Sequence, residues 1–337
     1  MTAPGAAAAR TPGRTSPLAA RATEPRRPDP RPFADPAPVR QPATGAELAL
    51  TVTEFTDPAC PWAWGSEPAL RLLGHTLGPL WRWRRVFGIL FDEDDDEAPD
   101  PSAEARWYDG FIREVAAHTG APYPEALRWL TRSSWPASAA AKAAETQGRE
   151  VGERVLRRLR ESTFVHGTPA DTADGIRWAV TGVPGLDVGR LMDEAASAAT
   201  RAAVAADRAQ ARRPIAEVVG LDGDGPHPGG AKELARGRRY ALPTLLFEGP
   251  GGRVCAPGWQ SFDAFLAAAG RAAGSSAQRA ARPSASAALE RWRSLSGPEL
   301  ALLTREQAPP RDAVRIRTAG GPLWLHPAET AARSAGR

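Results

Sequence analysis

The sequence predicts an α/β protein in which a long helical segment interrupts a small mixed sheet. A short β-rich run, Leu48–Phe55, is followed by helix-compatible residues and then by a second β-rich run, Leu80–Leu90. A β pattern returns only at Tyr240–Trp259, after a long helical stretch over Ser102–Val219. Because a strand, a helix and a second strand usually form a right-handed parallel unit, the first two strands are expected to be parallel.

The helix after the first strand has a clear start. Pro61 suits the first helical position, which places Cys60 at the N-cap. Leu70, Leu73 and Leu77 then recur at helical spacing, and the next residue is a glycine that can end the helix. The sequence therefore predicts one helix that begins directly after a cysteine.

The central segment divides into several helices. Trp107, Phe111 and Val115 step by four residues, which is typical of a helix face packed into a core. Glycine and proline at Gly120–Pro122 and Val183–Gly185 mark breaks between helices.

The last third of the chain contains short elements. A hairpin is expected around Glu248–Gly252, followed by a helix over Ser261–Ala269. After a linker, a short helix at Ala288–Leu295 and a hairpin turning at Gly320–Gly321 are expected. These last elements suggest a plain αββ cap, with a reduced winged-helix unit as the alternative.

The N-terminal segment differs from the rest in composition. Residues 1–45 hold ten prolines, seven arginines and three acids, so their charge excess equals the net charge of +4 of the whole chain. Such a composition predicts a disordered leader, and the neutral remainder gives no reason to expect a nucleic-acid partner. The predicted boundaries are a leader at 1–46, two halves of a sheet-containing part at 47–90 and 240–271, a helical insertion at 91–239, and a linker with a small C-terminal extension at 272–337.

Composition also limits the compartment and the cofactors. Two cysteines in 337 residues do not make a disulfide framework, and no run of about 18 apolar residues could span a membrane. We therefore expect a cytoplasmic protein with no membrane partner. The five histidines are scattered, and the acidic run Asp92–Glu97 lacks the glycine and ligand order of a calcium loop. That run is expected to be a solvated loop, and neither a metal site nor a tightly bound cofactor is expected.

Three segments together resemble a known family. They are DPACPWAW at Asp57–Trp64, SAAAKAAETQG at Ser138–Gly148 and ALPTLLF at Ala241–Phe247. The combination resembles the DsbA-like oxidoreductases, in particular their FrnE-like cytoplasmic branch, over about Leu48–Gly270. The resemblance implies a thioredoxin-like α/β fold with a large helical insertion, with the disordered leader and the small C-terminal extension outside it.

The resemblance also implies a candidate site around Cys60. A cysteine at a helix N-terminus faces unpaired N–H groups and the positive end of the helix dipole, which both favour the thiolate. We therefore expect Cys60 to be the nucleophile, with a pKa below that of a free thiol. The resemblance implies a cis Leu242–Pro243 bond and docking of the partner at a further set of residues, which are Pro61, Trp62, Leu242, Pro243 and Thr244.

One position departs from the family. Ala63 replaces the second cysteine, so the thiol that would release a mixed disulfide is absent. Cys255 is expected to be buried and too far from Cys60 to form a disulfide. Four basic residues before Pro243 could lie near the site, although a solvated loop is the simpler interpretation; they are Lys232, Arg236, Arg238 and Arg239.

The predicted function is monothiol exchange. Cys60 would exchange mixed disulfides with protein or small-molecule thiols and disulfides, and a low-molecular-weight thiol would serve as co-substrate. Two alternatives stay open: a non-catalytic binding module of the same fold, such as a protease adapter, and a glutathione-type thiol-dependent isomerase or transferase.

Deleting residues 1–45 is expected to leave the melting temperature and the reactivity of Cys60 unchanged. The reason is that a proline-rich segment with few large apolar side chains buries little surface. Thermal unfolding and thiol alkylation of the truncated and full-length chains check this, and a drop of several degrees would show that the segment packs on the fold.

Overall fold

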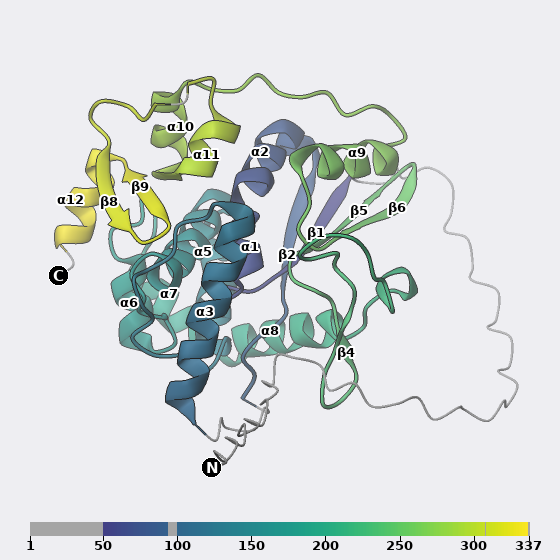
Figure 1. The fold of residues 1–337 in the computed structure, drawn as a ribbon, viewed down its shortest axis with the longest axis horizontal. Coiled ribbons are helices and arrows are strands. Elements are labelled where there is room, and N and C mark those ends of the chain that lie inside the picture. Colours follow the sequence, from purple (N-terminus) through teal and green to yellow (C-terminus); the bar gives the residue numbers. More distant parts are fainter. Residues whose placement is uncertain (1–49, 94–99, 307, 336–337) are drawn as a thin grey trace, which may run out of the picture.

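The centre of the molecule is a four-stranded mixed sheet. The computed structural model describes residues 50–93, 100–306 and 308–335, so the predicted leader at 1–46 lies outside the described residues. The sheet has the order β2-β1-β5-β6 (Figure 1). Its strands are β1 (Thr51–Thr56), β2 (Arg82–Phe87), β5 (Thr244–Gly249) and β6 (Gly252–Pro257). β1 is parallel to β2 and antiparallel to β5, which confirms the predicted parallel unit and the return of the chain to the sheet after the insertion.

Two helices cover one face of this sheet. α2 (Glu67–Leu77) and α9 (Phe262–Ala273) pack against apolar side chains of the sheet, with Leu73, Phe247 and Phe265 fully buried between them. The predicted single helix after Cys60 is in fact two. α1 (Pro61–Gly65) ends at Ser66, whose Oγ donates a hydrogen bond to the carbonyl of Trp62, and α2 starts at the next residue.

Helices from the insertion form a second core on the other side of the molecule. The helices of this core are α4 (Trp135–Ala144), α5 (Arg149–Phe164), α6 (Ala173–Val180), α7 (Val188–Ala195) and α8 (Ala198–Ala211). The first helix of the insertion, α3 (Pro101–Thr119), packs instead in the clusters that contain Cys60 and Trp64. The buried faces of α4 and α5 meet Phe87 and Ile89 at the end of β2, so this core continues from the sheet. Two short strands, β3 (Lys232–Glu233) and β4 (Arg238–Arg239), precede β5.

The first residue of the acidic run after β2, Asp92, is buried and ion-paired, although the run was expected to be a solvated loop. Asp92 is 6% exposed and accepts hydrogen bonds from Arg208 and Arg212, both at 2.6 Å. The reason is that α8 presents two guanidiniums at the place where the run starts. Glu93 pairs with Arg201 of the same helix, and residues 94–99 lie outside the described residues.

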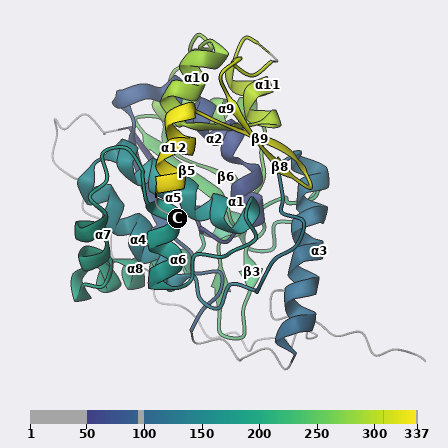
Figure 2. The same ribbon diagram turned by 90° about the vertical axis from the view of Figure 1, so that its left-hand side faces the viewer.

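The C-terminal part is larger than the αββ cap expected from the sequence. It contains α10 (Ala285–Trp292), β7 (Ser294–Ser296), α11 (Gly297–Leu303), β8 (Val314–Thr318), β9 (Gly321–Leu325) and α12 (Pro327–Ala335). The predicted hairpin is present, and β7 adds a third strand in the order β7-β9-β8. Figures 1 and 2 show this part resting on α2 and α5. Its buried leucines, among them Leu295, Leu300 and Leu303, join the core of the first sheet.

Buried ion pairs fasten the C-terminal part to the rest of the fold. The guanidinium of Arg157 on α5 donates to both carboxylate oxygens of Glu299 on α11, each at 2.9 Å. Arg71 on α2 reaches the same carboxylate at 2.9 Å, and Arg157 also pairs with Glu161 at 2.8 Å. Glu299 is fully buried and Arg157 is 3% exposed, so removing either charge would leave the other buried and would lower the free energy of unfolding.

Further pairs extend this network in both directions. Arg160 of α5 binds Glu67 at the start of α2 and donates to Thr56 Oγ1 at the end of β1 at 2.6 Å. Arg333 of α12 pairs with Glu161 at 2.6 Å. One helix, α5, therefore holds the sheet, α2 and the C-terminal elements together.

The contribution of Glu67 to stability is expected to disappear in acid. Burial disfavours its charged form, but Arg160, Arg71 and Arg157 outweigh that effect and lower its pKa from 4.5 to about 2. A carboxyl whose pKa is depressed on folding stabilises the fold above its unfolded pKa and loses that effect as the pH falls through the folded pKa. The difference in unfolding free energy between wild type and Glu67→Gln should thus shrink by roughly 3 kcal/mol between about pH 5 and pH 2.

Urea unfolding of both proteins across this pH range measures that difference. The comparison with the variant is needed because other buried carboxyls, such as Asp57, have raised pKa values and act in the opposite direction. A difference that stays constant with pH would contradict the assignment.

Candidate functional site

Cys60 lies at the N-cap of α1, the position predicted from Pro61. Its backbone is extended, with φ −84° and ψ 118°, and its carbonyl accepts the first helical hydrogen bond from the Trp64 N–H at 3.0 Å. The side chain does not point to solvent: it is 4% exposed, and Sγ donates to the Leu242 carbonyl at 3.4 Å. The end of β1, the start of α1 and the segment before β5 thus meet at this sulfur.

Burial overrides the helix terminus in setting the charge of Cys60. Removal from water is the largest influence and raises the pKa of the thiol to about 11, and the Asp57 carboxylate adds to the rise. The N–H groups of Ala63 and Trp62 and the charge of Arg239 act in the opposite direction without balancing it. The expected thiolate is therefore wrong for this structure, in which Cys60 is a neutral thiol.

The predicted docking edge is already hydrogen-bonded within the chain. The Leu242–Pro243 peptide bond is cis. The Leu242 carbonyl accepts from Cys60 Sγ and from His227 Nε2, the latter at 3.0 Å. The Pro243 carbonyl accepts from the Gly258 N–H at 2.9 Å, and the buried Thr244 hydroxyl donates to Ala241. A partner chain could pair with the Leu242 carbonyl only after these contacts open.

Aromatic rings pack on Trp62, which belongs to the same buried cluster as Cys60. His227 stacks on the indole of Trp62 with ring centroids 4.9 Å apart and planes 8° apart. Trp259 and His118 also approach Trp62, each at 6.0 Å. The backbone of His227 is also fixed, because its carbonyl accepts a hydrogen bond from the Trp259 N–H at 3.1 Å. Pro61 and Trp62 are both buried, so of the predicted docking residues none presents a free surface.

His227 is neutral in this arrangement. Burial is the main cause that lowers its pKa, to about 4, and Lys232 lowers it further. Because a carbonyl can only accept, the ring proton sits on Nε2 and points to Leu242. Sequence reasoning grouped this histidine with four scattered ones, and no spacing signal connects residue 227 to residue 62.

Two further residues support the Cys60 turn and were also missed. Asp57 is fully buried and accepts from the N–H groups of Ala59 and Leu90, both at 2.8 Å, and burial raises its pKa. The Tyr108 hydroxyl of α3 donates to the Ala59 carbonyl. Asp57 could have been found from its place three residues before the cysteine, whereas the contact of Tyr108 depends on how α3 packs.

The other residues singled out from the sequence differ in their burial and in their relation to Cys60. Ala63 is completely buried at the position of the absent second cysteine. Cys255 lies on β6 and is a free thiol, half-buried where full burial was expected, because β6 is the edge strand of the sheet. Of the four basic residues before Pro243, Arg239 is buried and acts on the charge of Cys60, whereas Arg238 forms an exposed pair with Glu233.

The described residues contain no group of three metal-ligating side chains close enough to hold an ion. Within the same part of the chain, no helix is both long and apolar enough to cross a membrane.

Direct titration of Cys60 is expected to show a midpoint near pH 11, well above the value of about 8.5 for a free thiol. The rate of iodoacetamide alkylation of a Cys255→Ala variant, followed against pH, reports this midpoint because Cys60 is then the single thiol. A midpoint below the free-thiol value would show that the helix terminus, and not burial, controls the sulfur.

Replacing His227 by alanine is expected to expose the thiol. The change removes the ring stacked on Trp62 and one of the two hydrogen bonds to Leu242, so alkylation of Cys60 at fixed pH should speed up severalfold. His75→Ala serves as a matched control, because His75 contacts Arg291 and Ala281 and none of the site residues. Equal rates in the two variants would contradict a covering role for His227.

Comparisons with known proteins agree with this architecture. Residues 54–213 match a family model described as Thioredoxin. The ClpXP adapter protein SpxH of Shouchella clausii is 31% identical over 147 residues, which are 43% of this chain and 48% of that protein. The chain thus spans about half the length of this curated relative.

Solved structures are similar at lower identity. A putative protein disulfide isomerase from Nitrosomonas europaea aligns with a TM-score of 0.49 and 15% identity, over 65% of this chain and 94% of that one. The cytosolic disulfide reductase DsbM from Pseudomonas aeruginosa aligns with a TM-score of 0.43 and 19% identity, over 61% and 88%. Residues 54–213 thus match the thioredoxin family model, and the sheet, the cysteine at the start of α1 and the insertion described above make up a thioredoxin-like α/β fold with a large helical insertion.

Proposed function

We propose that this chain acts by binding a protein partner, as an adapter built on the thioredoxin fold, and not by turning over disulfides. The observation that carries the proposal is the state of Cys60: its thiol is 4% exposed and donates to the Leu242 carbonyl. Thiol–disulfide exchange needs a thiolate with access to the attacked sulfur. A neutral, buried thiol in the same cluster as Trp62 offers neither.

The absence of a resolving thiol supports the same proposal. In dithiol enzymes a second thiolate attacks the mixed disulfide, takes over the bond to the first sulfur and releases the partner as a thiol. Ala63 cannot do this. Cys255 is a poor substitute, because burial and the nearby Glu217 raise its pKa to about 12.

The kind of partner is suggested by the curated relatives. The proteins matched at 31% and 34% identity are ClpXP adapter proteins, although less than half of each is aligned. We extend that role to this chain: it would present a protein to the ClpXP protease in the cytoplasm, with no bound cofactor.

Monothiol exchange is the second candidate, and the position of Cys60 favours it. The cysteine stands at a helix start with the buried Arg239 lowering its pKa, so exposure of the thiol would bring back part of the reactivity expected from the sequence. In that case an external thiol would finish each cycle by attacking the Cys60 mixed disulfide.

Protein half-lives in cells separate the two candidates. In a strain lacking this chain, a set of proteins should turn over more slowly, and the same set should be slowed by loss of ClpX. A Cys60→Ser chain keeps the O–H donor to Leu242 but has no thiol, so under the adapter proposal it restores turnover as well as wild type does. Restoration by Cys255→Ser but not by Cys60→Ser would overturn the proposal in favour of thiol chemistry, and unchanged half-lives would overturn the adapter role itself.

Purified protein gives an independent test. With dithiothreitol as reductant and a model protein disulfide as substrate, the wild type should be no faster than Cys60→Ser. A clear difference between them would support monothiol exchange and contradict the adapter proposal.

A further inference from the structure

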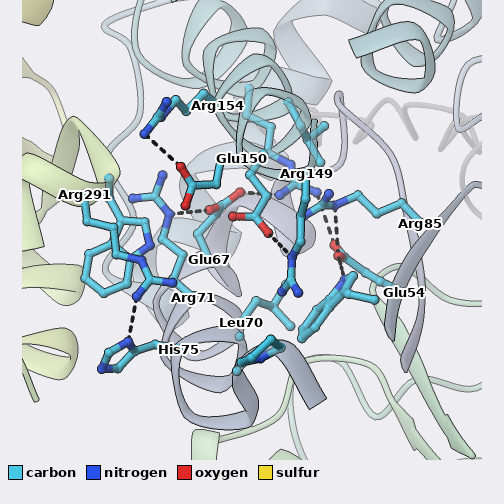
Figure 3. A pocket seen from close by; sticks show the side chains of 18 residues that line it. Glu54, Glu67, Leu70, Arg71, His75, Arg85, Arg149, Glu150, Arg154 and Arg291 are labelled. Carbon is cyan, nitrogen blue, oxygen red and sulfur yellow. Dashed lines mark hydrogen bonds and ion pairs between the residues drawn. The ribbon is translucent and has the colours of Figure 1, made fainter. Parts of the chain in front are cut away.

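A second candidate site lies apart from Cys60. It is a cavity of about 270 Å³ bordered by β1, β2, α2, α5 and α10. None of the residues Cys60, Trp62, Leu242 and Pro243 lines it. Its walls come from the sheet, from the insertion and from the C-terminal part, so it exists only because these three segments pack together (Figure 3).

The walls carry more positive than negative charge. Six arginines and four glutamates line the cavity, which leaves an excess of two guanidiniums. The buried carboxylates at its base are fully engaged: Glu54 binds Arg85 and the indole N–H of Trp83, and Glu67 binds Arg71 and Arg160. One of the two excess charges lies at the base and the other nearer the mouth, where Arg149, Arg154 and Arg291 face only Glu150 and Glu153 among the lining residues.

These outer arginines are available to a ligand. Arg149 and Arg154 pair with Glu153 and Glu150 one helical turn away, and the Glu150 side chain is 74% exposed. Both glutamates are at least partly exposed and pairs of this kind are weak, so an incoming anion can replace the glutamates.

Arg291 has a histidine where the others have a carboxylate. Its guanidinium donates to His75 Nδ1 at 2.8 Å, and His75 Nε2 contacts the Ala281 carbonyl at 3.1 Å. Since an arginine can only donate, His75 accepts at Nδ1. In Figure 3, Arg291 and His75 lie at one end of the cavity and Arg85 and Glu54 at the other.

A buried hydrogen-bond donor in the cavity wall, the Nε–H of Arg160, also favours a ligand with an acceptor oxygen. Arg160 is 2% exposed, and its Nε–H makes no hydrogen bond with the described residues, although its other nitrogens bind Glu67 and Thr56. A buried N–H without an acceptor is unfavourable, and because Arg160 lines the cavity, an oxygen of a bound ligand could accept from it.

The cavity also offers flat and apolar surface. Trp83 and Trp292 line it together with Leu70, Pro79 and Leu156. The Arg291 guanidinium lies 5.3 Å from the ring centre of Trp292, so charge and aromatic surface adjoin. Typical ligand sites enclose roughly 300–1,000 Å³, and this cavity suits a molecule at the small end of that class.

We propose that this cavity binds a small phosphate monoester that carries a flat ring, the chemistry of a nucleoside monophosphate. The dianionic phosphate takes the guanidiniums of Arg154 and Arg291, which charge-assisted hydrogen bonds favour. The ring lies against the apolar and aromatic surface that adjoins these arginines, which includes Trp292. This site is separate from Cys60, and the proposal does not depend on the adapter role.

Calorimetric titration of the full chain tests the proposal with adenosine 5′-monophosphate, adenosine and inorganic phosphate as three separate probes. The nucleotide should bind, and adenosine and phosphate should each bind at least tenfold more weakly, a difference of about 1.4 kcal/mol. Arg154→Gln and Arg291→Ala should each weaken the nucleotide by about tenfold or more. Arg253→Ala should change nothing, since Arg253 forms an exposed pair on β6 away from the cavity.

Several results would overturn the proposal. If adenosine bound as tightly as the nucleotide, the cavity would not recognise the phosphate. If inorganic phosphate bound as tightly, the ring would contribute nothing to binding. No binding of the nucleotide at about 1 mM, or binding unaffected by both arginine variants, would exclude the site. Arg291 is exposed, so Arg291→Ala remains an informative variant even if Arg154→Gln does not fold.

Discussion

The buried pairing of Arg157 with Glu299 is the contact on which the rest of this structure depends. It joins α5 of the insertion to α11 of the C-terminal part through two parallel hydrogen bonds of 2.9 Å, with Arg71 of α2 on the same carboxylate. The guanidinium carbon of Arg157 also lies 4.3 Å from the ring centre of Trp64, a residue of α1, the helix that has Cys60 as its N-cap. One guanidinium therefore ties the sheet-covering helices, the insertion and the C-terminal elements to the site helix. The second cavity has the same origin, because Glu67, Arg71 and Arg160 form both its base and part of this network.

At Cys60, as in the ion-pair network, burial opposes the charged form of the side chain while nearby charges and N–H groups favour it. In the network the charged form prevails, whereas at Cys60 the neutral form does. In the network, the carboxylates and guanidiniums compensate one another, and Glu67 stays ionised although it is buried. At Cys60 the N–H groups of the helix start and the charge of Arg239 compensate for burial only in part, and Asp57 opposes them. Desolvation then prevails and the thiol keeps its proton. A thioredoxin-type helix start is thus not sufficient for a reactive cysteine when the thiol is buried.

Local patterns were enough to predict the sheet, its interruption and the position of Cys60. Pro61 at a helix start and the β-rich runs depend on neighbouring residues alone, so they could be read from the sequence. The contacts of His227 with Trp62 and Leu242 could not, because they join segments about 165 and 15 residues apart through a loop whose path is set by packing. The same holds for the C-terminal part: nothing in the residues around Glu299 indicates that Arg157 and Arg71 will surround it. Asp92 was misplaced for this reason too, since its partners Arg208 and Arg212 come from α8.

The most direct test of this account is the unfolding of a Glu299→Gln variant, compared with Glu290→Gln, whose exposed side chain lies in the same C-terminal part. Urea unfolding should be followed by both tryptophan fluorescence and circular dichroism. We expect Glu299→Gln to lose about 3–5 kcal/mol in a single transition seen alike by both probes, because the buried Arg157 and Arg71 lose the carboxylate that they share. Glu290→Gln should lose less than about 1 kcal/mol. A loss for Glu299→Gln as small as that of the control, or separate melting of the C-terminal part, would contradict the claim that this ion pair holds the fold together.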